Sequence, residues 1–169
     1  MSELNILITG ITGFVGSHMT DYLLDNVDGV KIYATRRWRS KEDNIKHLFG
    51  NEGVVFEECD LLDRGSLSRI IEISKPDIVY HFAAQSFPES SFLTPATTLM
   101  TNVIGTTNLM EELRIARDRK VIGNPKILSV ASSDEYGMPL DGDDIPIKET
   151  KPIRAANPYS ISKVGHDLI

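Results

Sequence analysis

The chain has 169 residues, of which 41% are hydrophobic and 25% charged, enough for one domain with a full core. A formal net charge of −6 argues against nonspecific binding to nucleic acid or to an anionic membrane surface. The single cysteine, Cys59, excludes an internal disulfide framework. No apolar run approaches the length of a membrane span, and the amino terminus is typical of a strand rather than a signal peptide. We therefore expect a soluble, cytoplasmic protein.

Apolar runs of strand length alternate along the chain with stretches of helical periodicity. Strands are predicted at 5–9, 30–35, 54–57, 78–81 and 126–130. Helices are predicted near 16–26, 66–74 and 95–119, with a last one from about residue 158 and one short helix within the polar stretch 39–49. This alternation predicts an α/β fold, a Rossmann-like doubly wound parallel sheet with helices on both faces and its first strand central.

A glycine-rich loop follows the first predicted strand at once, with Gly10, Gly13 and Gly16 spaced G-x-x-G-x-x-G. Strand, glycine loop and helix in this order are typical of the first half of a dinucleotide-binding unit. Gly10 permits the tight turn, Gly13 lets the backbone approach the pyrophosphate, and Gly16 brings the helix close to the sheet. The phosphates are expected at the helix N-terminus, where free N–H groups favour anions. Cofactor contacts are also expected from three neighbouring residues, Thr12, Phe14 and Val15.

Two arginines, Arg36 and Arg37, follow the second predicted strand, where an NAD site usually has an acid that binds the ribose 2′-hydroxyl. A guanidinium is permanently charged and binds a phosphate through two parallel hydrogen bonds. The alternative is a solvated basic turn. The pair therefore predicts NADP rather than NAD.

The third and fourth predicted strands also end in candidate contacts. Asp60 and Leu61 are placed to contact the adenine, and a helix-capping role for Asp60 is the weaker alternative because Asp63 and Ser66 are better placed as caps. Two small residues, Ala83 and Ala84, stand where a cofactor would pass the backbone. The next two residues, Gln85 and Ser86, carry polar groups able to face a sugar hydroxyl. For Gln85 taken alone, an ordinary loop residue is an equal alternative.

Near the end of the chain, the run Ser-Ser-Asp-Glu-Tyr-Gly at 132–137 precedes Tyr159 and Lys163. A Tyr and a Lys four residues apart on a helix project from one face, and the ammonium makes the phenol easier to ionise, so that it works as an acid or base. The Ser132 hydroxyl is placed to hold a substrate alcohol against that phenol. Asp134 and Glu135 are either solvated or supply the acid and base that loss of water from a sugar requires.

The four histidines, His18, His47, His81 and His166, show no metal spacing and have no cysteine partners, so no metal is expected. His81 and His166 are interpreted as packing or surface residues. The stretch 95–119 carries more apolar residues than one helical face needs, and its surplus predicts a subunit interface together with the helix containing Lys163. Its apolar residues include Leu99, Val103, Leu109, Met110 and Leu113.

Together these motifs resemble the extended short-chain dehydrogenase/reductase family. The resemblance spans the chain and rests on the glycine loop, Asp60-Leu61, residues 83–86, Asn102 in Thr-Asn-Val-Ile-Gly-Thr, Ser132, Tyr159 and Lys163. Within the family, residues 36–37, 84–86 and 133–137 look like the branch of GDP-mannose 4,6-dehydratases and the reductases of their 4-keto-6-deoxy product. The resemblance implies an NADP-dependent enzyme acting on a nucleotide sugar, with catalytic Ser132, Tyr159 and Lys163.

One position departs from the dehydratase pattern, because Asp134 stands where the dehydratases have Glu. Reductases also carry an acid there, so both activities remain open, while epimerases share the core without needing it. The leading hypothesis is a GDP-mannose 4,6-dehydratase-type lyase in which Asp134 or Glu135 assists loss of water. A non-enzymatic NADP-sensing regulator is a remote alternative, because such proteins typically lack the Tyr-Lys pair. Residues 1–169 are expected to form the NADP-binding domain of a longer chain, a homodimer or homotetramer, with the substrate domain beyond them.

Overall fold

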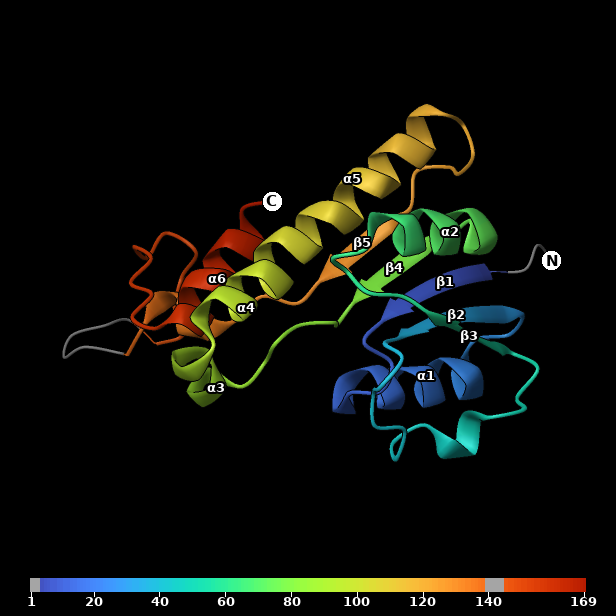
Figure 1. The fold of residues 1–169 in the computed structure, drawn as a ribbon, viewed down its shortest axis with the longest axis horizontal. Helices are drawn as coiled ribbons and strands as arrows, with labels where there is room; N and C mark the ends of the chain where they lie inside the picture. Colours follow the sequence, from blue (N-terminus) through green and yellow to red (C-terminus); the bar gives the residue numbers. More distant parts are fainter. Residues whose placement is uncertain (1–3, 139–144) are drawn as a thin grey trace. The chain divides into compact units, whose positions relative to one another are not determined.

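The computed structural model describes residues 4–138 and 145–169. Its centre is a five-stranded parallel sheet in the order β3-β2-β1-β4-β5 (Figure 1). The strands are β1 Leu4–Thr9, β2 Val30–Arg36, β3 Val54–Glu58, β4 Ile78–His81 and β5 Lys126–Ser129. The predicted doubly wound sheet with a central first strand is therefore confirmed, and each strand lies within one residue of its predicted bounds.

Helices occupy the predicted stretches and two further ones. The described helices are α1 Phe14–Asn26, α2 Arg64–Ser74, α3 Pro88–Leu93, α4 Pro95–Leu99, α5 Gly105–Asp118 and α6 Pro158–Asp167. Short 3-10 turns lie at η1 Lys46–Leu48 and η3 Ser133–Tyr136. The single helix predicted over 95–119 is instead α4, a turn of π-helix (η2 Met100–Ile104) and α5 in succession. Neither α3 nor η3 was predicted.

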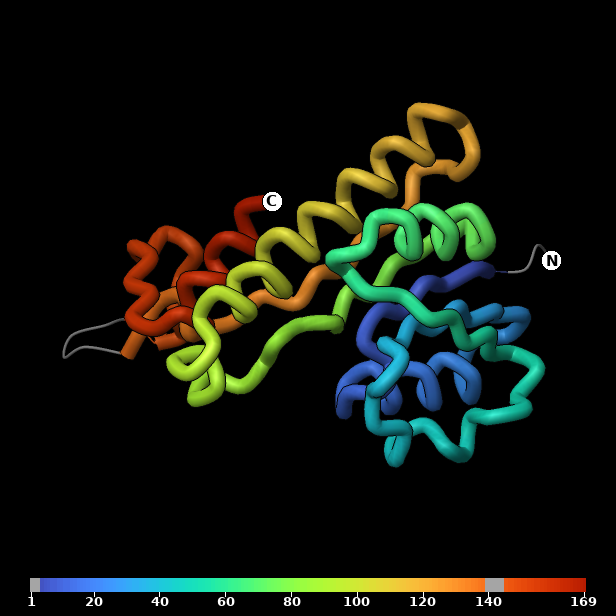
Figure 2. Tube along the Cα trace, in the orientation of Figure 1, coloured from blue at the N-terminus to red at the C-terminus, as the bar shows by residue number. Residues whose placement is uncertain are grey.

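The core lies on both faces of the sheet, because alternate side chains of a strand point to opposite faces. On one face Leu7 of β1 and Val79 of β4 pack with apolar residues of α2 and α5, including Leu67 and Leu109. On the other face a separate cluster combines residues of β1 and β2 with α1 and the segment around η1, namely Ile6, Ile8, Ile32, Leu23, Ile45 and Leu48. Figure 2 shows α1 and α2 on opposite sides of the strands.

The four residues of β5 are exposed, unlike the inner strands. β5 pairs with β4 at one edge of the sheet as described, and the residues Ile127 and Leu128 are 41% and 46% exposed. The two-sided cover expected from the sequence thus applies to the inner strands.

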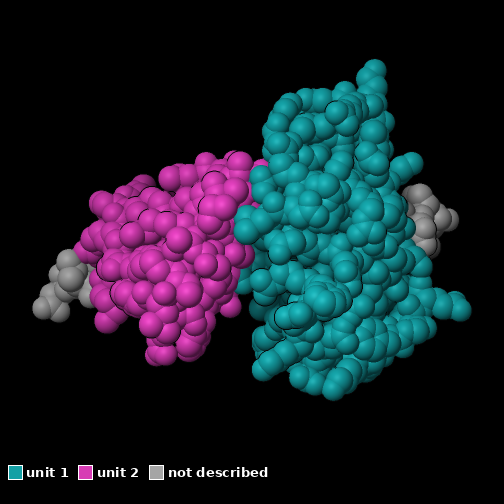
Figure 3. All heavy atoms as spheres, viewed as in Figure 1, with its two compact units in different colours: residues 1–84, 108–130 teal, residues 85–107, 131–169 magenta. Residues whose placement is uncertain are grey.

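The chain divides into two compact units (Figure 3). Unit 1 comprises Met1–Ala84 and Asn108–Val130, and it contains the sheet. Unit 2 comprises Gln85–Thr107 and Ala131–Ile169, and it contains α3, α4, η2, η3 and α6. Within the described ranges, no helix combines the length and apolar character needed to cross a bilayer.

Candidate functional site

In unit 1 the glycine loop has the close packing that its spacing predicts. Gly10 has a φ of +77°, and a Cβ added there would lie 2.7 Å from the backbone nitrogen of Ala83. A Cβ at Gly16 would lie 2.4 Å from the carbonyl oxygen of Gly10. Gly13 is the N-cap of α1, has no side chain to cap the helix, and donates its N–H to the Gly10 carbonyl at 3.1 Å. Only glycine fits at positions 10 and 16, so the loop backbone lies close both to the residues that follow β4 and to the start of α1.

Two buried side chains below the loop fix the end of β4 to the end of β1. The Thr9 Oγ1 and His81 Nδ1 atoms lie 2.7 Å apart, and the Ala83 N–H donates to Thr9 Oγ1 at 3.2 Å. His81 is 1% exposed, which confirms the packing role expected from the sequence. Since Ala83 is held in this way, its backbone stays against Gly10.

The two arginines that follow β2 have different surroundings. Arg36 forms an ion pair with Glu42, and its guanidinium carbon lies 5.9 Å from the ring centroids of both Phe49 and Phe56. Arg37 is exposed. Its backbone forms a turn in which the Ser40 N–H donates to the Arg37 carbonyl at 3.0 Å. The two predicted phosphate ligands are thus unequal, since one guanidinium already has an anionic partner.

Asp60 and Leu61 are both involved in local structure. The Asp60 Oδ1 atom accepts the Leu62 N–H at 2.9 Å, while Asp63 is the N-cap of α2, as the sequence predicted. The Leu61 side chain is buried in the core, and its carbonyl accepts a hydrogen bond from Asn108 Nδ2 at 3.0 Å. Because its side chain is buried, Leu61 could contact a cofactor only through its backbone atoms.

In unit 2 a fully buried asparagine organises the start of the loop after β4. The Oδ1 atom of Asn102, within the π turn, accepts the Gln85 N–H at 2.7 Å, and its Nδ2 donates to the Gln85 carbonyl at 3.0 Å. The same Nδ2 donates to Ser162 Oγ of α6 at 2.8 Å. Asn102 therefore joins the loop to the helix that carries Tyr159. Gln85 Oε1 is buried and has no hydrogen-bond partner among the described residues, whereas Ser86 is exposed.

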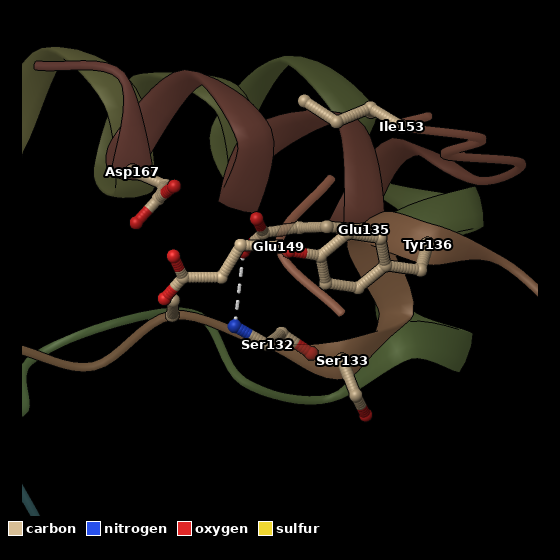
Figure 4. Close-up of a pocket in the computed structure, with 8 residues that line it drawn as sticks. Ser132, Ser133, Glu135, Tyr136, Glu149, Ile153 and Asp167 are labelled. Carbon is tan, nitrogen blue, oxygen red and sulfur yellow. Dashed lines mark hydrogen bonds between the residues drawn. The ribbon is translucent and has the colours of Figure 1, made fainter. Parts of the chain in front are cut away.

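The turn η3 begins with a capping box. Ser132 Oγ accepts the Asp134 N–H at 3.2 Å, and Glu135 Oε1 accepts the Ser132 N–H at 2.9 Å (Figure 4). Asp134 instead points to the N-cap of α6, where its Oδ2 accepts a hydrogen bond from Asn157 Nδ2 at 3.2 Å. Adjacent in sequence, the two acids are thus held by different partners.

An open pocket of about 710 Å³ lies beside this turn. Its described lining, drawn in Figure 4, includes Ser132, Glu135, Tyr136, Glu149 and Asp167. Five of the site residues predicted from the sequence lie in unit 2 but do not line this pocket: Gln85, Ser86, Asp134, Tyr159 and Lys163. The pocket therefore reaches the serine and one of the two acids.

Helix α6 brings Lys163 into the interior of unit 2. The side chain is 3% exposed, and burial lowers the pKa of its ammonium below the usual range while the charge of Glu135 raises it. His166, one turn further on, is 4% exposed, and its Nδ1 lies 3.0 Å from Thr106 Oγ1. Burial and, secondarily, the charge of Lys163 lower the pKa of His166 to about 4, so the ring is neutral at pH 7. Tyr159 lies one turn before Lys163 on the same helix and is partly exposed.

Two features of the site were missed at the level of sequence. The π turn that presents Asn102 was one, although a polar Asn within an apolar helical pattern was a usable signal. The capping box of η3 was the other, and its Ser-x-x-Glu spacing at 132–135 is the recognised signature of such a cap.

Comparison with known proteins extends this description. A sequence model of the GDP-mannose 4,6 dehydratase family matches residues 7–169. GDP-mannose 4,6-dehydratase of Vibrio cholerae serotype O1 is 33% identical over 97% of this chain and 44% of its own length. The dTDP-glucose 4,6-dehydratase of Neisseria meningitidis serogroup B is 30% identical, over 96% and 46%.

Solved structures of known proteins also match this chain. The UDP-glucose 4-epimerase of Thermus thermophilus in complex with NAD is 30% identical, with a TM-score of 0.78 over 96% of this chain and 48% of that one. The chain thus spans about half the length of the relatives it matches. Since the family match covers nearly all of it, the chain belongs to the GDP-mannose 4,6 dehydratase family, within the extended short-chain dehydrogenases/reductases.

Proposed function

We propose that the protein carrying this chain is a nucleotide-sugar 4,6-dehydratase that uses GDP-mannose. The observation that carries the proposal is the hydrogen bond between Asp134 and Asn157, which ties an acid-bearing turn to the N-cap of the helix holding Tyr159 and Lys163. A dehydratase needs an acid for the departing hydroxyl in addition to the Tyr-Lys pair. An epimerase needs only the pair, so the acid favours the dehydratase.

The roles of the residues follow from their chemistry. Tyr159, with Lys163 one turn away, takes the proton of the sugar 4-hydroxyl, which the Ser132 hydroxyl holds by a hydrogen bond. Loss of that proton together with the C4 hydride, for which a bound nicotinamide would be the acceptor, would give a 4-keto group, and that group would make the C5 proton acidic. One of the two acids of η3, Asp134 or Glu135, then assists the loss of water across C5 and C6. Gln85 Oε1, a buried acceptor with no partner among the described residues, supports a contact with a sugar hydroxyl.

The unit 1 loop fits a dinucleotide. A Cβ at Gly10 or Gly16 would fill the space by which the backbone approaches its neighbours, and α1 begins with an N-cap that has no side-chain bond. Such a helix start binds a pyrophosphate through its free N–H groups. Gly10, Thr12, Gly13, Phe14, Val15 and Gly16 would hold this part of the cofactor, with Asp60, Leu61, Ala83 and Ala84 along its course. The chemistry that a bound nicotinamide would supply is reversible hydride transfer.

We favour NADP because of the two arginines after β2. Arg37 is the better candidate for the 2′-phosphate, since Arg36 already pairs with Glu42. The Thermus thermophilus epimerase was solved with NAD, so NAD is the alternative that cofactor titration would reveal.

We also propose a homodimer or homotetramer. Leu109 and Leu113, which the sequence suggested as surplus, lie in the core, but Leu99, Ile104 and Ile161 of the packed group α4, η2 and α6 are 38%, 42% and 51% exposed. Light scattering that returns a monomer at micromolar concentration would reject this assembly.

The direct test is incubation of the full protein with GDP-mannose, with and without added NADPH. The proposal predicts a 4-keto product that forms without net change in the cofactor. Replacement of Tyr159 by Phe should leave cofactor binding nearly intact and abolish turnover. If GDP-mannose is unchanged while a 4-keto sugar oxidises NADPH, the protein is a reductase and the proposal is wrong.

A further inference from the structure

The segment between β2 and β3 is tied to the glycine loop by a side chain. Asn44 Nδ2 donates a hydrogen bond to the Thr12 carbonyl at 3.0 Å, across 32 positions of the sequence. Thr12 immediately precedes Gly13, the N-cap of α1. Both partners of the bond belong to unit 1. The bond therefore joins the segment that follows the two arginines to the start of the helix for which a pyrophosphate is proposed.

The peptide unit between Thr12 and Gly13 is held on both sides. A peptide unit is planar and trans, so its carbonyl and its N–H point in opposite directions. Here the carbonyl accepts the bond from Asn44, and the Gly13 N–H donates to the Gly10 carbonyl at 3.1 Å. Since both polar groups are bonded, rotation of this peptide unit is restricted. Its orientation sets the direction in which α1 begins and in which the N–H groups of the first helical turn point.

The position of Asn44 is itself fixed by its neighbours in the segment. Ile45 and Leu48 are 0% and 3% exposed and belong to the core cluster that α1 covers. His47 Nε2 lies 2.8 Å from Asp21 Oδ1 on α1. The Asn44 side chain is exposed, so its amide would bond to water if the contact with the loop were lost, and the net contribution to stability is small. The bond is thus better suited to orienting the loop than to stabilising the fold.

We propose that Asn44 is a positioning residue for the cofactor, which orients the peptide unit between Thr12 and Gly13 so that the N–H groups at the start of α1 face the pyrophosphate. The inference rests on the proposed function, because it requires a dinucleotide at the glycine loop. A loop that is oriented in advance avoids the cost of ordering the backbone on binding. NADP and NAD share the pyrophosphate, so Asn44 serves both equally, whereas Arg37 would distinguish them through the 2′-phosphate.

The test compares Asn44→Ala with Asn51→Ala in the full protein. Asn51 is also an exposed asparagine between β2 and β3, and its Oδ1 accepts the N–H of Gly53, at 2.8 Å, rather than bonding to the glycine loop. Calorimetric titration should show that Asn44→Ala binds NADP and NAD each about 2- to 12-fold more weakly, the range that one neutral hydrogen bond provides. Asn51→Ala should bind both cofactors as the wild type does.

Two further measurements separate positioning from general damage to the fold. Asn44→Gln keeps the amide donor on a longer side chain and should recover part of the lost affinity. The urea unfolding midpoints of Asn44→Ala and Asn51→Ala should agree, because each variant loses one exposed bond. A clearly lower midpoint in Asn44→Ala would assign the bond to the stability of the fold and overturn the inference. Unchanged affinities in Asn44→Ala, equal losses in Asn51→Ala, or a loss for NADP alone would also overturn it.

Failure of this inference and failure of the proposed function give different results. A protein that shows the effect of Asn44→Ala on both cofactors but leaves GDP-mannose unchanged contradicts the proposed function alone. A protein that forms the 4-keto product and binds both cofactors normally in Asn44→Ala contradicts this inference alone. A wild-type protein that binds neither dinucleotide contradicts both.

Discussion

Arg36 and Arg37 are identical residue types in adjacent positions, yet they differ in what they are able to bind. The guanidinium of Arg36 is neutralised by Glu42 and lies near two aromatic rings, whereas Arg37 is exposed. A sequence predicts a basic pair without its partners, because Glu42 is brought to Arg36 only by the folding of the segment after β2. The same is true of Asp134 and Glu135, which are neighbours with different hydrogen bonds.

Arg37→Ala should weaken NADP binding about 10- to 150-fold, since a charged hydrogen bond contributes roughly 1.5–3 kcal/mol. NAD binding should change little, because NAD has no 2′-phosphate. Titration of both cofactors, followed by fluorescence, measures the two affinities. Arg119→Ala, which removes an exposed arginine after α5, is the control. If Arg37→Ala lowers the affinities for NADP and NAD equally, Arg37 does not contact the 2′-phosphate.

His166 should make the fold sensitive to acid. Its pKa falls from 6.5 to about 4 in the folded protein, so the unfolded chain binds the proton more readily. The stability linked to the neutral ring is fully present above about pH 6.5 and is lost as the pH falls toward 4. Urea unfolding across this range should show a shallower pH dependence in His166→Gln than in wild type. His18→Gln, at an exposed site, should follow wild type, and parallel profiles for all three would show that His166 contributes nothing.

The elements that show a regular apolar pattern in the sequence were predicted. The elements that depend on hydrogen bonds from side chains, namely the π turn and η3, were not. Strands β1 to β5 follow from apolar runs, and Gly10 and Gly16 follow from the spacing of the loop. The π turn escaped prediction because one extra residue per turn hardly alters an apolar pattern. It is associated with the bonds of Asn102 to Gln85 and Ser162, which are distant in the sequence. Glu135 is likewise buried in the folded chain, which the local sequence pattern does not reveal.

Asn102→Ala tests the π turn as an element. The change leaves the Gln85 N–H and carbonyl without their partner and should cost about 2–3 kcal/mol of unfolding free energy, because buried polar groups would be unsatisfied. Chemical denaturation measures the cost. Asn26→Ala removes one exposed side-chain bond within α1 and should change stability by less than about 0.5 kcal/mol. Similar effects of the two changes would contradict an organising role for Asn102.

Gly16→Ala tests the contact between the loop and α1. The added Cβ would lie 2.4 Å from the Gly10 carbonyl oxygen, so the helix must move and the fold should lose about 1–3 kcal/mol. Cofactor affinity should fall as well. Gly123→Ala adds the same methyl where no atom lies within 4 Å and should be neutral. Thermal unfolding and cofactor titration on both variants give the comparison, and a stable Gly16→Ala with normal affinity would refute the close approach.

At the scale of the whole molecule, the described chain supplies two units that carry different parts of the proposed chemistry. The glycine loop and the arginines belong to unit 1, and Ser132, Asp134, Tyr159 and Lys163 belong to unit 2. The chain spans about half the length of its relatives. The names of these relatives refer to GDP-, dTDP- and UDP-linked sugars. The sequence therefore predicts the reaction class more firmly than the sugar.

In the proposed reaction, one hydrogen leaves C4 of the sugar and returns to C6 of the same molecule. Incubation of the full protein with GDP-mannose deuterated at C4, followed by NMR of the product, follows that atom. The account predicts a 4-keto-6-deoxy sugar with the deuterium at C6. Deuterium that returns to C4 with unchanged C6, as an epimerase would leave it, or that is lost to added cofactor, would contradict the account.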